Sequence, residues 1–232
     1  MKIDILTLFP EMFKGPFDES MIKMARKKKL VEINIHNLRN WTEDKHKTVD
    51  DRPYGGGKGM VIRVDVVDRA LKNLKSSIIN HKSSIILLSP QGKPYDQKKA
   101  KQLSKLEHLV LIAGHYEGFD ERIRKHLVDE EVSIGDYILT GGELPAMVIV
   151  DTVVRLLPGV LEPEATEHES FSSLKIENSK IGNLLDYPTY TRPENFKGWK
   201  VPKVLLSGNH AEIEKWRKGQ ALKSTKQKRP DL

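Results

Sequence analysis

Three glycine-rich segments contain most of the residues that could approach or bind a ligand. They are residues 52–60 (RPYGGGKGM), 113–122 (AGHYEGFDER) and 133–145 (SIGDYILTGGELP). In the first, backbone amides beside Arg52 and Lys58 could contact phosphate, because glycine lets the main chain approach a partner closely. The segment lacks the Gly-Lys-Ser/Thr ending of a P-loop, which argues against a nucleoside triphosphatase. A plain flexible loop is equally compatible with this composition.

The second and third glycine-rich segments each connect a predicted strand to a predicted helix, and LLSPQG at residues 87–92 closes a further predicted strand. In an open α/β sheet, ligands bind at the carboxyl ends of strands, so these three segments together predict one binding site. Neither glycine-rich segment matches G-x-G-x-x-G followed by a distant ribose-binding acid, which argues against a dinucleotide site. Each segment taken alone could be only a tight turn between a strand and a helix.

A group of acids that could exchange protons with a substrate lies between residues 160 and 186. It contains Glu164, Glu167 and Glu169, one of which could act as a general base, although the group could equally be a solvated charge run. His115 could face a ligand, or be a partly buried, hydrogen-bonded ring. The chain has no cysteine and no HExxH motif, which excludes a cysteine nucleophile and leaves no metal site to be read from the sequence.

The elements that must position these residues follow a βα rhythm from the start of the chain to about residue 158, which predicts an α/β fold with a parallel sheet and helices on both faces. Asp96 and Asp120 stand at helix N-cap positions, and Pro158-Gly159 ends the last helix of this region. The predicted strands are 3–9, 31–36, 84–88, 109–113 and 131–134, and the predicted helices are 18–29, 65–75, 96–106, 120–128 and 145–157.

Composition divides the chain into residues 1–159, 160–186 and 187–232. The middle region is polar, acidic and poorly periodic, which predicts a flexible linker. In the last region, Asn209 with Glu212 three residues later predicts the start of a helix. From Lys215 onward there are seven Lys or Arg residues against one acid. The third region is therefore predicted to be a small, basic helical domain.

The whole chain is basic, with 39 Lys and Arg residues against 32 Asp and Glu and a formal net charge of +7. Such an excess favours a polyanionic partner such as nucleic acid, although a basic but solvated surface is the simpler alternative. No run of about 18 apolar residues is present, and the N-terminus does not resemble a signal peptide. We therefore expect a cytoplasmic protein with no membrane partner.

Eight motifs follow one another along the chain: LTLFPEMF, RPYGGGKGM, LSPQG, AGHYEGFDER, SIGDYILTGGELPAM, RLLPGVL, YTRP and VPKVLLSGNH. Taken as a set and in this order, they closely resemble those of the bacterial tRNA (guanine-N(1))-methyltransferases of the TrmD type, in the SPOUT superfamily. The resemblance covers nearly the whole chain. It implies transfer of a methyl group from S-adenosylmethionine to N(1) of the guanosine immediately 3' of the anticodon. It also implies a trefoil knot at the C-terminal end of the α/β domain and a homodimer with the active site at the subunit interface and tRNA across both subunits.

The resemblance further implies that the methyl donor lies in the knot against backbone groups, where glycine leaves room for a nucleoside. Magnesium could assist, although no ligand motif for it can be read. The donor-binding residues implied are Leu87, Leu88, Ser89, Pro90, Gly114, Tyr116, Glu117, Gly118, Ser133, Ile134, Gly135, Asp136, Tyr137, Ile138, Leu139, Gly141, Gly142 and Pro145.

Three catalytic residues are implied by the same resemblance. Glu169 corresponds to the general base, at a position where the family usually has aspartate, Arg155 to the helix arginine, and Asp186 to the acid after Leu-Leu. The implied tRNA-binding residues are Arg52, Lys58 and Arg192.

Two other functions are compatible with part of these observations. A non-catalytic RNA-binding protein would use the basic tail and the first glycine-rich segment, but the intact glycines of the other two segments argue against it. A SPOUT methyltransferase acting on rRNA or on a ribose hydroxyl would share the donor site, but the RPYGGGKGM and YTRP segments argue against it.

Overall fold

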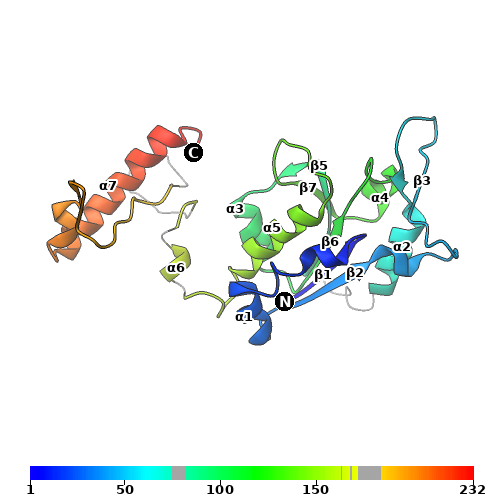
Figure 1. The fold of residues 1–232 in the computed structure, drawn as a ribbon, viewed down its shortest axis with the longest axis horizontal. Coiled ribbons are helices and arrows are strands. Elements are labelled where there is room, and N and C mark those ends of the chain that lie inside the picture. The colour runs from blue at the N-terminus through cyan, green and yellow to red at the C-terminus, as the bar shows by residue number, and fades with distance from the viewer. Residues whose placement is uncertain (75–81, 163, 168, 172–183) are drawn as a thin grey trace. The chain divides into compact units, whose positions relative to one another are not determined.

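The chain forms two compact units, Met1–Leu161 and Glu162–Leu232, shown as a ribbon in Figure 1. The computed structural model describes residues 1–74, 82–162, 164–167, 169–171 and 184–232.

The first unit is built on a five-stranded sheet in the order β2-β1-β6-β5-β7, in which every neighbouring pair is parallel. Each predicted strand is present, which confirms the α/β class and the parallel sheet. The strands are β1 Lys2–Thr7, β2 Glu32–Asn37, β5 Ser83–Pro94, β6 His108–Ala113 and β7 Glu130–Ser133.

Strand β5 is longer than predicted, because it continues through the segment that the sequence predicts to be a loop. Leu88 and Lys93 both pair with Val132 of β7, so the four residues between them leave the ladder and the chain then returns to it. Pro and Gly in this excursion explain why the sequence pattern ends the strand at Leu88.

The helices of the first unit are α1 Ser20–Lys27, α2 Val64–Leu74, α3 Gln97–Leu103, α4 Glu121–His126 and α5 Glu143–Val154. The predicted N-caps are confirmed, since Asp96 accepts a hydrogen bond from the Lys99 N–H at 2.7 Å and Asp120 accepts one from Arg122 at 2.9 Å. Helix α5 begins two residues before the predicted Pro145. Proline is tolerated there because the first turn of a helix needs no donor from its own N–H groups.

Side-chain alternation along the strands produces a buried core on each face of the sheet. Ile3 and Ile5 of β1 pack with residues of α1, α3 and α5, whereas Leu6 packs with residues of α2 and α4. Successive side chains of a strand point to opposite faces, so two layers of helices are needed to cover them. Helices therefore cover both faces of the sheet, as predicted.

A buried ionic cluster lies at the amino end of the sheet. The carboxylate of Asp4 on β1 is fully buried and meets His36 Nε2 at 2.7 Å, His108 Nε2 at 2.6 Å and Lys2 Nζ at 3.2 Å. Burial alone would raise the pKa of Asp4, but the hydrogen bonds with His36 and His108 and the charge of Lys2 outweigh it. The pKa of Asp4 is therefore held well below its usual range.

Short elements complete the first unit. They are two 3-10 helices, η1 Pro10–Phe13 and η2 Leu38–Trp41, and the antiparallel strands β3 Asp50–Asp51 and β4 Val61–Ile62. Strands β3 and β4 bracket the glycine-rich segment 52–60, which forms a loop, as predicted. Four of its glycines have positive φ angles between 81° and 126°, a region that other residues rarely adopt.

The second unit contains α6 Glu164–Glu167, the hairpin strands β8 Asn195–Phe196 and β9 Trp199–Lys200, η4 Lys203–Leu206 and α7 His210–Lys228. The predicted start of α7 is confirmed, because Asn209 accepts a hydrogen bond from the Glu212 N–H. Most of the predicted linker 160–186 belongs to this unit, although residues 163, 168 and 172–183 lie outside the described residues. Across the described parts of both units, no helix is both long and apolar enough to cross a membrane.

Candidate functional site

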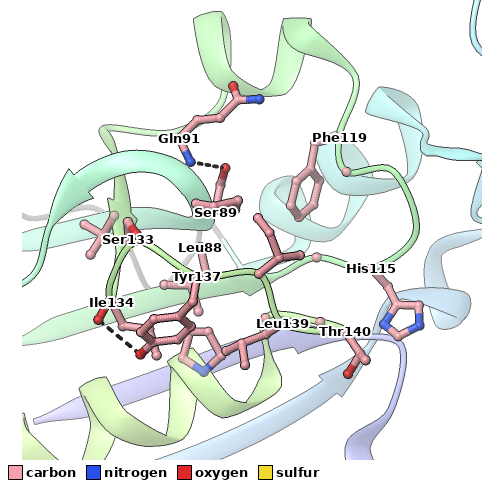
Figure 2. Close-up of a pocket in the computed structure, with 18 of the residues that line it drawn as sticks. Leu88, Ser89, Gln91, His115, Phe119, Ser133, Ile134, Tyr137, Leu139 and Thr140 are labelled. Carbon is pink, nitrogen blue, oxygen red and sulfur yellow. Dashed lines mark hydrogen bonds between the residues drawn. The ribbon is translucent and has the colours of Figure 1, made fainter.

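A cavity of about 320 Å³ lies at the carboxyl ends of β5, β6 and β7 in the first unit, as Figure 2 shows. Its wall is made by the chain at or after the ends of these strands, at residues 88–91, 114–119, 132–135 and 137–142, together with Pro145 of α5 and Arg124 of α4. The three segments that the sequence assigned to one binding site are thus together in the structure. Their convergence follows from the parallel sheet, in which all carboxyl ends lie at one edge.

All the residues predicted to bind the donor line this cavity except two, Leu87 and Asp136. The side chain of Leu87 is fully buried in the core between the sheet and α2, because it points to the opposite face of β5 from Leu88. Asp136 is exposed and does not contribute to the wall.

Several residues of the wall were not selected from the sequence. Arg124 donates hydrogen bonds to the carboxylate of Glu131 at 2.8 Å and to the carbonyl oxygen of Phe119 at 3.1 Å, and so joins α4, β7 and the loop after β6. No sequence signal marks Arg124, since it lies inside an ordinary surface helix. The residues of this kind are Gln91, Phe119, Arg124, Val132 and Thr140.

The glycines of the wall have a packing role besides the one expected. A Cβ on Gly142 would lie 2.7 Å from the Ala113 Cα and the Gly114 N, and the Gly142 N–H donates to the Gly114 carbonyl at 2.8 Å. A Cβ on Gly141 would lie 2.3 Å from Glu143 Oε2. These glycines therefore let the loops after β6 and β7 pack on each other and on α5, rather than only leaving space for a nucleoside.

Two polar side chains beside these glycines, Glu143 and His115, differ in their hydrogen bonding. Glu143 is buried at the first turn of α5, where the helix dipole favours a negative charge, and it accepts a 2.8 Å hydrogen bond from the Thr7 hydroxyl. The buried Nδ1 atom of His115 has no hydrogen-bond partner within the described part of the chain. His115 thus lies in the wall with one buried, unpaired polar atom, packed against Gly141.

The first glycine-rich loop is attached to the cavity wall by backbone hydrogen bonds. The Glu117 N–H donates to the Met60 carbonyl at 3.0 Å, and the Ile62 N–H donates to the Gly118 carbonyl at 2.9 Å. Arg52 and Lys58 are exposed on this loop. The two predicted phosphate-contacting cations thus lie on a loop anchored next to the cavity.

The predicted catalytic residues do not line this cavity. Arg155 caps the C-terminal end of α5, whereas the cavity lies at the N-terminal end of that helix. The 12 residues of α5 separate the two ends by about 18 Å. Arg155 of the same chain is therefore remote from the cavity.

Glu169 and Asp186 lie on two chain segments that are held together within the second unit. The Asp186 N–H donates to the Ser170 hydroxyl at 3.0 Å, and the Phe171 N–H donates to the Leu184 carbonyl at 2.7 Å. The carboxylate of Asp186 accepts a hydrogen bond from the Tyr187 N–H at 2.7 Å. Arg192, predicted to contact tRNA, is exposed in the same unit.

Within the described residues, no three His, Asp or Glu side chains are placed to hold a metal ion. His36 and His108 each contact the carboxylate of Asp4. The part of the chain that the structure describes therefore offers no site to which a bound metal could be assigned from protein ligands alone.

Comparison with known proteins gives a match along the full chain. The family model described as "tRNA (Guanine-1)-methyltransferase TrmD" matches residues 1–232. A protein of Bacillus pumilus is 56% identical over 232 residues, which is all of this chain and 91% of the relative. Proteins of Dictyoglomus turgidum and Bacillus subtilis are 55% and 54% identical over the whole chain and 89% and 92% of their own lengths. All three relatives carry the name tRNA (guanine-N(1)-)-methyltransferase.

Proposed function

The chain belongs to the TrmD family of tRNA (guanine-1)-methyltransferases, and from this we infer that it methylates N(1) of the guanosine immediately 3' of the tRNA anticodon. The methyl donor of this reaction is S-adenosylmethionine. The single structural observation that supports the inference best is the cavity at the carboxyl ends of β5, β6 and β7, which lies where open α/β sheets bind ligands.

The cavity fits a nucleoside-containing donor in size and in chemistry. Its volume of about 320 Å³ falls in the range of small-molecule sites, and apolar side chains such as Leu88 and Leu139 line its wall together with several glycines. When bound, the donor supplies a methyl group that its sulfonium centre already activates. We propose that the lining residues predicted from the sequence hold it.

The chemical problem left to the protein is the proton on the guanine ring nitrogen. That nitrogen becomes a competent nucleophile only as its proton leaves, so we assign Glu169 as the base that accepts the proton while the new N–C bond forms. Negative charge then grows on the neighbouring carbonyl oxygen, and the guanidinium of Arg155 stabilises it in the transition state. Asp186, hydrogen-bonded to the Tyr187 N–H, is proposed to orient the loop that carries Glu169.

This assignment requires a second subunit. Arg155 is separated from the cavity of its own chain by the length of α5, about 18 Å, so we propose a homodimer in which the Arg155 of one subunit meets the cavity of the other. Apolar side chains near the cavity support such an interface, because Leu144 and Val148 of α5 are 48% and 42% exposed and Met12 of η1 is 43% exposed. Exposed apolar groups of this kind are typical of protein interfaces.

Other parts of the proposal come from the family resemblance. They are a trefoil knot in the domain 1–159, a connecting segment at 160–186 and a basic tRNA-binding domain at 187–232. The 2.8 Å hydrogen bond from the Gly142 N–H to the Gly114 carbonyl supports the knot, since it returns the chain after β7 to the loop after β6.

Arg52, Lys58 and Arg192 are proposed to contact tRNA phosphates. Magnesium is proposed only as an ion assisting through the tRNA, and the cytoplasm is proposed as the location, with the tRNA.

The function is tested by incubating the purified chain with S-adenosylmethionine and a tRNA transcript, and by mapping the modified base by mass spectrometry. We expect one methyl group on N(1) of the guanosine next to the anticodon, and none on a control transcript with adenosine at that position. Methylation elsewhere, or none by a folded protein that binds the donor in calorimetry, would contradict the proposal.

A further inference from the structure

The hairpin formed by β8 and β9 in the second unit exposes two large aromatic side chains. Trp199 is 73% exposed and Phe196 is 51% exposed. The two residues are direct cross-strand partners, so their side chains lie on the same face of the hairpin. Their ring centroids are 5.8 Å apart with an angle of 62° between the planes. Two adjacent aromatic rings that are left in solvent are a signal of binding rather than of folding.

A tight, hydrogen-bonded turn fixes the position of the strands that carry these rings. Lys197 and Gly198 at its tip both have positive φ angles, 52° and 89°, as a tight two-residue hairpin turn requires. The Gly198 N–H donates to the Asn195 side chain at 3.0 Å, and the Val201 N–H donates to the Glu194 carbonyl at 2.9 Å. Because these two hydrogen bonds fix the turn before a ligand binds, the hairpin loses little conformational freedom when the rings contact a partner.

A positive charge lies beside the two rings. The Lys197 ammonium is 5.4 Å from the centroid of the Phe196 ring. Lys200 is exposed as well, but it pairs with Asn195 and so lies on the opposite face of the hairpin. An aromatic face combined with a lysine side chain suits unpaired nucleotides, because a base stacks on the ring while the ammonium group meets a phosphate. An apolar protein partner would use the rings but not the lysine.

We propose that the Phe196–Trp199 face of this hairpin is a stacking platform for an unpaired base of the RNA substrate, with Lys197 next to a flanking phosphate. The inference rests on the proposed function, since it takes tRNA as the substrate. It adds a contact that depends on base stacking to the phosphate contacts proposed for Arg52, Lys58 and Arg192.

The test separates stacking from charge by measuring tRNA binding over a range of salt concentrations. Trp199→Leu keeps an apolar side chain but removes the large aromatic face, so tRNA affinity should fall by about tenfold with an unchanged slope of log affinity against log salt. Trp199→Phe keeps an aromatic face and should retain most of the affinity. Lys197→Gln should instead reduce the salt slope by about one.

Three outcomes are informative beyond the expected one. Wild-type affinity in Trp199→Leu would overturn the inference, as would equal losses in the Leu and Phe variants. If Trp199→Leu lowers the molecular mass in light scattering and leaves RNA affinity unchanged, the rings are a subunit contact and the inference is wrong. Wild-type protein is assayed for tRNA methylation in parallel, so that failure of the proposed function is seen separately from failure of the hairpin.

Discussion

Glu169 is the residue on which the proposed chemistry depends most. Glu169→Gln keeps the size and hydrogen bonding of the side chain but cannot accept a proton. Single-turnover methyl transfer should therefore slow by about a hundredfold or more, the usual scale for loss of a general base. The affinities for donor and tRNA should barely change, because the loss concerns only the transition state.

Glu169→Asp is the control for this change. It retains a carboxylate and should remain active, since the family usually has aspartate at this position. Asp186→Asn and Glu117→Gln are made in parallel. If either of these is inactive while Glu169→Gln transfers methyl groups at the wild-type rate, the base has been assigned to the wrong residue.

Asp4 should make the free energy of unfolding of the first unit depend on pH in the acidic range. Its pKa is lowered in the folded state from an ordinary value of 3.8, so its contribution is present above that value and is lost as the pH falls below it. Removing one partner of a buried ionic group costs about 3 kcal/mol. Asp4→Asn should therefore be less stable than wild type by about that amount at neutral pH, and the difference should shrink near pH 3.

Urea unfolding of both proteins at pH 7 and at pH 3 measures this difference. The Asp4 carboxylate is distant from the cavity along β1, so donor binding by Asp4→Asn at neutral pH serves as the control for a native fold. A difference in stability that is the same at both pH values would show that the cluster with His36 and His108 is not linked to the titration of Asp4.

At the scale of elements, the junction between β6 and the start of α5 is the tightest contact around the cavity. A Cβ on Gly142 would meet backbone atoms of Ala113 and Gly114 at 2.7 Å, and backbone in a central strand cannot move aside. Gly142→Ala should therefore destabilise the protein by about 1–3 kcal/mol and weaken donor binding. Thermal unfolding and calorimetry with S-adenosylmethionine measure the two effects.

Gly219→Ala provides a matched control for this substitution. Gly219 lies inside α7, and a Cβ there would meet nothing within 4 Å. The same change should then stabilise the protein by up to about 1 kcal/mol, because alanine has the higher helix propensity. If Gly142→Ala and Gly219→Ala change the stability of the protein in the same way, the close approach of backbone atoms at Gly142 does not exclude a Cβ there.

At the scale of the whole molecule, the proposed site needs two subunits. Light scattering should report about twice the chain mass of 26.5 kDa. A monomer with full activity would contradict the dimer, because Arg155 of the same chain is separated from the cavity by the whole of α5.

Mixed dimers test which subunit supplies Arg155. One chain carries Arg155→Ala, and the other carries Leu139→Trp, which fills the cavity. Each homodimer should be inactive, whereas an equal mixture should recover about a quarter of the wild-type sites, because half of the dimers then contain one intact site. If Arg155 acted in the cavity of its own chain, no mixture would recover activity.

The sequence by itself determined the parts of this protein that depend on neighbouring residues. Strands, helices and their caps at Asp96, Asp120 and Asn209 follow from apolar spacing and from side chains that bond to the next turn. Because carboxyl ends meet at one edge of a parallel sheet, the same local signals were enough to bring most of the cavity wall together. The motif set was also enough to indicate the family.

Only the tertiary structure decided which distant residues meet. The strand order brings together elements that are far apart in the chain, and so does the return of β5 to Val132. The contacts of Thr7 with Glu143 and of Asp4 with His108 do the same for single residues. Leu87 does not line the cavity because its side-chain direction depends on the pleat at the end of β5. No sequence signal marks Arg124, because a helix residue shows no sign of what it packs against. Such contacts depend on how the chain packs, and no local periodicity encodes them.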